Sequence, residues 1–227
     1  MGEKLSLTIR REETMPRYLA IFALTLLAFL NYACANPAAN KPKASVTNAA
    51  PETNPAKPAG AETLAISPDN SKVEFVAAKV TRSHNGSFKQ FNGTIDLLGN
   101  SAEQSRVTID IETGSVVTDE DQLTGHLKTP DFFDVAKYPK ATFVSTAIAP
   151  GTAGGPAYNI VGNFDLHGVK KSITFPATIQ IAPDNVSVNA EFAINRKDFG
   201  LVYPGKADDL IRDGVVIRLT LKVPRKP

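Results

Sequence analysis

Histidines and clustered carboxylates are the side chains of this sequence that could most readily support acid–base or metal chemistry. The three histidines, His84, His126 and His167, lie far apart along the chain. If they converged in the fold they could bind zinc or another transition metal. Histidines in turns and at strand ends more often only form hydrogen bonds, and the spacing favours that interpretation. His126 alone is kept as a candidate ligand contact, at the mouth of a cavity.

Catalytic motifs are absent from the sequence. The acidic run Asp119–Asp121 could supply an acid–base pair, but it is typical of the first turn of a helix. There is no glycine-rich phosphate loop, no nucleophile elbow and no zinc-protease motif. The single cysteine, Cys34, excludes an intramolecular disulfide and a zinc site made of several thiolates. We therefore expect no catalytic residue, no metal, no cofactor and no enzymatic activity.

Arg196, in the run Asn195–Gly200, has two interpretations. An arginine near the rim of an apolar cavity could pair with a carboxylate, a phosphate or a quinone oxygen of an amphipathic ligand. Alternatively, Asp198 or a neighbouring carboxylate holds Arg196 in a purely structural ion pair.

The stretch Leu123–Phe143 carries two adjacent phenylalanines where a loop is expected. Asp119–Leu127 is predicted to be a short amphipathic helix, because two leucines four residues apart share one face. Pro130 prevents the helix from continuing. Phe132 and Phe133 then follow between two aspartates. Large apolar rings in a loop must pack against something, so we expect this segment to close one end of a β-barrel with an apolar interior.

Apolar and polar residues alternate along most of the chain after Leu64. Such alternation predicts antiparallel strands with one buried and one solvated face. Because closure removes exposed edges, we expect an all-β fold, an eight-stranded antiparallel barrel with a short helical insertion, whose interior is either filled or holds one small ligand. The predicted strands are Ser71–Val80, Gly86–Leu98, Arg106–Thr113, Lys140–Ala149, Ala157–Leu166, Ser172–Ile181, Val186–Asn195 and Val215–Val223.

The N-terminus has the composition of an export signal. Arginines precede the apolar run Tyr18–Leu30, which is shorter than the ~20 residues that span a bilayer. Residues 1–33 are predicted to be a signal peptide of the lipoprotein type, with lipidation at Cys34. The competing interpretation is cleavage at Ala33–Ala35, which would leave a soluble periplasmic or secreted protein. The net charge of +2 does not suggest a nucleic-acid partner.

Residues 34–63 are rich in alanine, proline and asparagine. Such a segment has too little apolar surface to fold, and we expect a disordered tether that holds the domain of residues 64–227 off a membrane.

The chain from about Ile66 onward resembles the YceI-like family of bacterial periplasmic polyisoprenoid-binding proteins. The resemblance rests on S-K-V-E-F, H-N-G-S-F-K-Q-F-N-G, G-H-L-K-T-P-D-F-F-D-V-A-K-Y-P-K-A-T-F, G-N-F-D-L-H-G-V and N-R-K-D-F-G, which begin at Ser71, His84, Gly125, Gly162 and Asn195. The sequence departs from the family pattern at Ala77–Lys79. Members of the family usually have a histidine there, soon after the Val-x-Phe, so the residues that would contact a ligand's head group do not follow from the resemblance.

The resemblance implies a lipocalin-like barrel whose elongated apolar cavity binds a long isoprenoid, either a quinone or a polyprenyl lipid, for transport or storage. The alternative is a tethered, non-enzymatic interaction or stress-response module with a filled core. A homodimer is left open, and the expected location is the periplasm, with a membrane anchor at Cys34. The candidate ligand-binding residues are Phe75, Phe91, Ile95, His126, Leu127, Phe132, Phe133, Phe143, Phe164, Phe175, Phe192 and Arg196.

Overall fold

The computed structural model describes residues 36–51, 57–151 and 157–225, all of which belong to one unit, Cys34–Pro227. The predictions for the export signal and for lipidation at Cys34 lie outside the described residues. Within the described ranges no helix is both long enough and apolar enough to cross a membrane.

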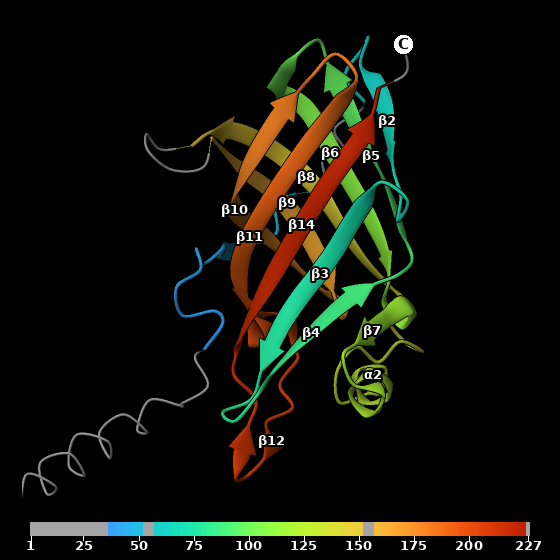
Figure 1. Cartoon of the computed structure of the whole chain (residues 1–227). Coiled ribbons are helices and arrows are strands. Elements are labelled where there is room, and N and C mark those ends of the chain that lie inside the picture. Colours follow the sequence, from blue (N-terminus) through green and yellow to red (C-terminus); the bar gives the residue numbers. More distant parts are fainter. Residues whose placement is uncertain (1–35, 52–56, 152–156, 226–227) are drawn as a thin grey trace, which may run out of the picture. The chain divides into compact units, whose positions relative to one another are not determined.

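Alternating apolar and polar residues produce an extensive antiparallel sheet (Figure 1). Its long strands are β3 (Ser71–Ala78), β4 (Ser83–Phe88), β5 (Phe91–Leu98), β6 (Ser101–Glu112), β8 (Lys140–Pro150), β9 (Tyr158–Leu166), β10 (Val169–Ile181), β11 (Asn185–Asn195) and β14 (Gly214–Pro224). The short strands are β1 (Ser45–Asn48), β2 (Glu62–Ile66), β7 (Val116–Thr118), β12 (Gly205–Lys206) and β13 (Asp209–Leu210).

The sheet follows the order β2-β5-β6-β8-β9-β10-β11-β14-β3-β4-β7, and it curls strongly around its apolar face (Figure 1). The curl brings β2 at one end of this order against β14. Arg225, just after β14, forms a salt bridge of 3.0 Å with Glu62 in β2. The core therefore lies inside one curled layer, and the predicted all-β antiparallel architecture is confirmed.

The number of strands is larger than predicted. Each of the eight predicted strands is present, but Gly86–Leu98 is two strands, because the chain turns a corner at Lys89–Gln90. Ser115 holds this corner: its carbonyl accepts the N–H of Lys89 and its Oγ accepts the N–H of Gln90. As a result β4 joins β3, whereas β5 joins β2 and β6. The alternation breaks at this corner, because Phe88 and Phe91 are three residues apart with Lys89 and Gln90 between them, and the prediction of one continuous strand overlooked that break.

The predicted disordered tether is wrong for part of its length. Residues 36–51 have described structure, and β1 pairs antiparallel with β10, Ser45 opposite Thr174 through Asn48 opposite Lys171. Ala38 is buried against Val76. The physical reason is that a polar segment can be ordered when a sheet edge supplies backbone hydrogen bonds, even though its composition cannot build a core.

The helical insertion follows β6 and closes one end of the curled sheet. The single-turn helix η2 (Thr113–Ser115) and β7 lead to α2 (Asp121–Leu127), within the predicted helix Asp119–Leu127. Thr118 fixes the start of α2 through a 2.9 Å hydrogen bond between its hydroxyl and that of Thr124. A loop then brings Phe132 into the apolar cluster around Phe75.

Gly162, in β9, provides the space for the ring of Phe143. A Cβ at this position would lie 2.4 Å from Phe143 Cζ and 2.6 Å from the carbonyl oxygen of Val144. We expect Gly162→Ala to destabilise the fold by ~1–3 kcal/mol, because a packed ring and a backbone atom must both move. Urea unfolding monitored by circular dichroism measures this change.

Gly125→Ala is the matched control, because a Cβ at Gly125 in α2 meets no atom within 4 Å. Alanine is the better helix former there by ~0.5–1 kcal/mol, so this variant should be at least as stable as the parent. Equal stability of the two variants would contradict the assigned packing around Phe143.

Candidate functional site

Two adjoining apolar cavities lie within the curled sheet. The central cavity has a volume of about 80 Å³ and the end cavity, beneath the helical insertion, about 110 Å³. The central cavity is lined by Val73, Glu74, Phe75, Phe88, Ile109, Ile111, Phe143, Phe164, Ile173, Phe175, Phe192, Ile194, Ile217 and Leu219. The end cavity is lined by Phe75, Ala77, Phe88, Ile111, Leu127, Phe132, Phe133, Ala141, Phe164, Leu166, Ile194, Arg196, Leu201, Ile211, Val215 and Ile217.

A shared wall separates the two cavities. Residues common to both linings include the aromatic side chains of Phe75, Phe88 and Phe164. The rings of Phe75 and Phe88 are 5.8 Å apart, and Phe88 meets Phe133 edge-on at 5.7 Å. A rotation of these rings would join the cavities into one elongated apolar space.

Strand periodicity positions most of the lining. Inward side chains alternate with outward ones, as in β11, where Phe192 and Ile194 reach the central cavity and Glu191 points outward to Arg218. Phe175 of β10 stacks on Phe192 with ring centroids 4.2 Å apart and nearly parallel planes. Phe143 of β8 packs against Phe175 at 5.6 Å.

The two adjacent phenylalanines after Pro130 lie at one end of the interior, where they line the end cavity together with Leu127. Phe132 is 7% exposed. Outside it, the ring of Tyr203 lies 5.3 Å away in a tilted contact, so two aromatic rings cover the interior at this end of the barrel. A loop of this composition is ordered because its rings are removed from water.

His126 lies at this end but does not line either cavity. Its Nε2 is 2.8 Å from Asp131 Oδ2, and its ring packs edge-on against Phe132 and Tyr203. The side chain is partly exposed, at the outer surface of the plug. The structure thus gives His126 a structural partner, and any contact with a ligand stays a prediction.

Arg196 borders the end cavity and is buried, with only 4% of its surface exposed. It begins the single-turn helix η3 (Arg196–Phe199). Its guanidinium donates to the carbonyl oxygens of Leu201, Arg212 and Ile211, and reaches Asp213 Oδ1 at 3.4 Å. Burial lowers the pKa of Arg196, and Asp213 opposes that shift.

The arrangement around Arg196 fits the structural interpretation, with Asp213 as the carboxylate in place of the expected Asp198. Arg196 connects η3 to the chain before β14, and it presents the apolar part of its stem to the cavity. A ligand oxygen would have to compete with four existing acceptors.

Two predicted lining residues lie elsewhere. Phe91 and Ile95 are both buried, in the part of the core around Leu64, and neither lines a described cavity. Phe88 and Ile217 line both cavities and were not among the candidates. Strand alternation could have identified Ile217, because it shares the inward face of its strand with Val215 and Leu219. Phe88 precedes the corner at Lys89, so assigning its direction from the pattern of one continuous strand was not reliable.

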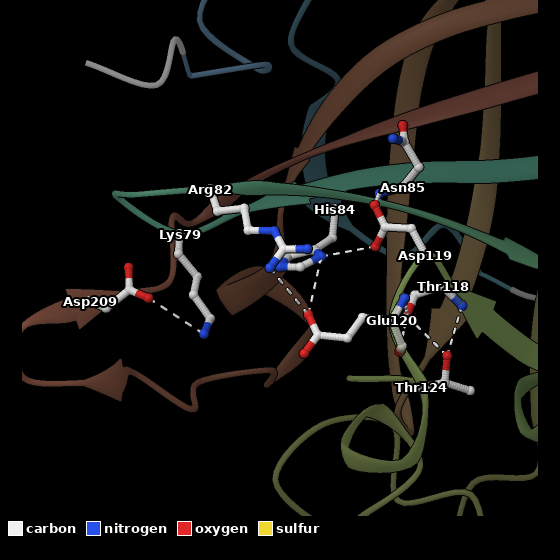
Figure 2. A network of polar contacts seen from close by, with 9 residues as sticks. All are labelled: Lys79, Arg82, His84, Asn85, Thr118, Asp119, Glu120, Thr124 and Asp209. Atoms are coloured by element: carbon white, nitrogen blue, oxygen red, sulfur yellow. Dashed lines mark hydrogen bonds and ion pairs between the residues drawn. The ribbon is translucent and has the colours of Figure 1, made fainter. Parts of the chain in front are cut away.

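His84 belongs to a polar network outside the cavities (Figure 2). Its Nδ1 is 2.9 Å from Asp119 Oδ1 and 3.9 Å from Glu120 Oε2, and Arg82 approaches Glu120 at 3.7 Å. The second Asp119 oxygen accepts the backbone N–H of Asn85. These contacts fasten the segment before α2 to β4, so the network supports the helical insertion.

No metal site is found where the structure describes the chain. His167 packs against Tyr138 at 4.6 Å, distant in sequence from the other two histidines, and no group of three or more His, Cys, Asp or Glu side chains among the described residues could hold a metal ion.

Comparisons with known proteins agree with this architecture. The model of the YceI-like domain matches residues 64–223. A UPF0312 protein of Pseudomonas putida is 34% identical over 126 residues, which cover 53% of this chain and 65% of that protein, so the chain spans just under two thirds of the relative's length. A UPF0312 protein of Pseudomonas fluorescens is 31% identical over 132 residues, or 56% of this chain and 68% of that protein.

Solved structures share the fold. Burkholderia cenocepacia BcnA is 28% identical, with a TM-score of 0.59 over 67% of this chain and 95% of that one. A polyisoprenoid binding domain from Saccharophagus degradans, implicated in plant cell wall breakdown, has a TM-score of 0.58 at 21% identity over 73% of this chain and 99% of that one. The chain therefore belongs to the YceI-like family, as its motifs predicted, and has the family's lipocalin-like curled sheet.

Arg196→Met should destabilise the fold by about 2–4 kcal/mol. The methionine keeps the apolar stem but leaves three carbonyl oxygens, in one buried and two partly buried hydrogen bonds, without this donor. Thermal unfolding followed by circular dichroism measures the loss.

Lys197→Met is its matched control. Lys197 is the neighbouring residue, is about half exposed and also pairs with Asp213, at 3.0 Å. Because an exposed ion pair contributes little, this variant should change stability by less than ~1 kcal/mol. Equal effects of the two substitutions would refute the structural role of Arg196.

The network around His84 predicts a pH dependence of stability. Partial burial acts to raise the pKa of Asp119, but the hydrogen bonds from His84 and the N–H of Asn85, with the charge of Arg82, outweigh it and hold the pKa below its usual value. A carboxyl with a lower pKa in the folded chain stabilises the fold above the unfolded-state pKa, near 4, and loses that contribution as the pH falls through the folded value.

Asp119→Asn should therefore flatten the fall of the urea midpoint between about pH 5 and pH 3. Asp121→Asn, at the start of α2, is the control substitution. If the parent and Asp119→Asn lose stability in parallel over this range, the assignment is incorrect.

Proposed function

We propose that this member of the YceI-like family binds a long isoprenoid lipid, such as a prenylated quinone or a polyprenyl alcohol, with its tail inside the curled sheet. The observation that carries this proposal is the pair of adjoining cavities, whose linings are apolar apart from Glu74 in one and Arg196 in the other. A lining of this kind suits a chain of hydrocarbon units and offers little to a polar metabolite. The Saccharophagus degradans neighbour, described as a polyisoprenoid binding domain, supports the same class of ligand.

Binding of a long tail requires the cavities to join and expand. Each is smaller than the ~300–1,000 Å³ typical of small-molecule sites. The tail would displace the rings of Phe75, Phe88 and Phe164, which form the shared wall. Burial of the tail contributes ~25 cal/mol per Å² of apolar surface, which must offset this rearrangement and the ordering of the ligand.

The same small volumes favour a second candidate function. A barrel whose interior is already mostly filled could act as a non-enzymatic interaction or stress-response module, without any lipid. The two candidates differ in one measurable respect, namely whether the purified protein contains lipid.

Native mass spectrometry of the Cys34→Ser chain, exported and purified without detergent, separates them. Removal of Cys34 prevents lipidation, so any added mass belongs to a non-covalent ligand. The carrier proposal predicts an added mass that matches a prenylated quinone or polyprenyl alcohol. A chain that is bare, and stays bare after incubation with geranylgeraniol, would leave the filled-core module as the better account.

We also propose a cellular location and a role for the protein. The sequence of residues 1–34 supports export to the periplasm, attachment to a membrane through Cys34 and a role in transport or storage of the lipid. Because the cavities contain no arrangement of nucleophile and base, we propose that the protein binds its ligand without transforming it.

Ala141→Leu tests the site directly. Ala141 is 1% exposed and lines the end cavity, so the larger side chain should occupy the space meant for the tail. We expect the dissociation constant for geranylgeraniol to rise at least tenfold, or ~1.4 kcal/mol, in an equilibrium assay with tritiated ligand.

Ala65→Leu is the control for added bulk, since Ala65 in β2 is exposed on the outer face. It should bind the ligand like the parent. Unchanged binding by the folded Ala141→Leu variant would exclude the end cavity as part of the ligand site.

A further inference from the structure

The wall of the curled sheet is interrupted between β10 and β11. These two strands pair only from Thr178 opposite Asn189 to Ile181 opposite Val186. Towards the end of the barrel that holds η3, they continue with other partners: β10 pairs with β9 along its far edge, and β11 pairs with β14 as far as Asn195. The facing edges of β10 and β11 therefore separate, and we call the gap between them the seam.

A segment from outside the matched family domain fills the seam. We call residues Pro42–Asn48 the strap; they are drawn in blue beside β10 and β11 in Figure 1. On one side, the N–H of Ala44 donates to the carbonyl oxygen of Ala193 in β11, and the N–H of Ala193 donates to that of Pro42, both at 2.8 Å. On the other side, β1 pairs with residues 171–174 of β10. The strap thus acts as the missing wall strand.

The strap covers the central cavity. Ala44 and Val46 are half-buried and pack against the core, whereas Ser45 and Thr47 face solvent. Val46 lies opposite Ile173, which lines the central cavity. The stacked rings of Phe175 and Phe192 span the seam from β10 to β11 and line the same cavity. The strap therefore lies outside this part of the cavity lining, at the seam.

Few interactions hold the strap in place. Beyond its backbone hydrogen bonds, it is fastened by a 2.6 Å ion pair between Lys41 and Glu191, by the buried Ala38, and by the side-chain amide of Asn163 bonded to the backbone of Ala50. Its own apolar contacts with the core come from Ala44 and Val46. The strap ladder with β10 spans four residue pairs, whereas the neighbouring ladder of β11 with β14 spans eleven. Segments with so little buried surface open locally at low cost in free energy.

We propose that the seam is the entrance through which the isoprenoid tail reaches the central cavity, and that the strap opens and closes it. This inference rests on the proposed function, and it names the route to the same site. At the end of the barrel beneath the helical insertion, by contrast, the buried ring of Phe132 and the ring of Tyr203 cover the interior.

The position of the strap in the sequence fits this role. Pro42 lies eight positions after Cys34, so a lipidated Cys34 would keep the start of the strap within ~28 Å of the membrane. A side entrance held at that distance lets a tail leave the bilayer with little exposure to water.

A disulfide across the strap tests the proposal. In the full Cys34→Ser chain, Ser45→Cys with Thr174→Cys places two cysteines directly opposite each other in the β1–β10 ladder. Directly opposed residues have Cα atoms ~4.5–5.5 Å apart, which suits a disulfide. The probe is tritiated geranylgeraniol, and the rates of uptake and release are compared between oxidised and reduced protein.

The matched control is Thr178→Cys with Asn189→Cys. This pair joins β10 to β11 at the end of the seam where these two strands are already hydrogen-bonded to each other, and both positions are exposed. We expect the oxidised strap pair to exchange ligand at least tenfold more slowly than its reduced form, and the control pair to exchange equally in both forms. Equal rates for the oxidised and reduced strap pair, or equal slowing in the control, would overturn the inference.

The reduced proteins separate this inference from the proposed function. If they bind no geranylgeraniol, the lipid-binding proposal fails and the entrance fails with it. If the reduced proteins bind geranylgeraniol but oxidation of the strap pair does not change the exchange rate, the lipid-binding proposal stands and only the proposed entrance at the seam is wrong.

Hydrogen–deuterium exchange gives a readout that needs no ligand. The amide of Ala44 should exchange faster than amides in the β11–β14 ladder. Gly214→Ala should accelerate it further, since the new Cβ would lie 2.9 Å from that of Ala38. Strap amides as protected as that ladder would show a permanent wall and would overturn the inference.

Discussion

The burial of a single apolar sheet face governs this molecule. Each strand presents apolar side chains on one side, and the described residues contain no second layer large enough to cover that side. Only curling of the sheet upon itself removes these side chains from water, and the twist of antiparallel strands makes such curling natural. The corner at Lys89–Gln90 serves this constraint, because it carries the chain from β4 beside β3 to β5 beside β2. The helical insertion serves it too, by placing Phe132 over one end.

The same constraint shapes the candidate site. Side chains that face inward from strongly curved strands cannot all interdigitate, and phenylalanine rings leave gaps where they meet at an angle, as Phe75 and Phe88 do. The gaps that remain are apolar and adjoin one another. In the proposed function, a lipid tail would replace apolar contacts among these rings with apolar contacts of its own. Binding would then change the positions of the rings but not the apolar character of the interior.

The curvature of the sheet also leaves backbone groups of β10 and β11 unpaired with each other at the seam. β10 and β11 diverge towards one end, and their edge groups need partners there. The strap supplies them from a segment that lacks apolar character, so it is ordered by backbone hydrogen bonds and a few small side chains. A wall element held in this way is expected to open more readily than its neighbours, which is the basis of the proposed ligand entrance.

The sequence by itself determined the antiparallel all-β architecture, the helix before Pro130 and the aromatic plug, because period-two alternation and proline act locally. It also identified part of the cavity lining, including Phe75, Phe164 and Phe192, since strand parity sets direction, but it missed others such as Ile111 and Ile194. Tertiary structure alone decided the rest. The corner at Lys89 left Phe88 facing the cavities, Arg196 found its carboxylate in Asp213 rather than Asp198, and the strap found order at a sheet edge. These outcomes depend on groups distant in the sequence, whose proximity no local pattern encodes.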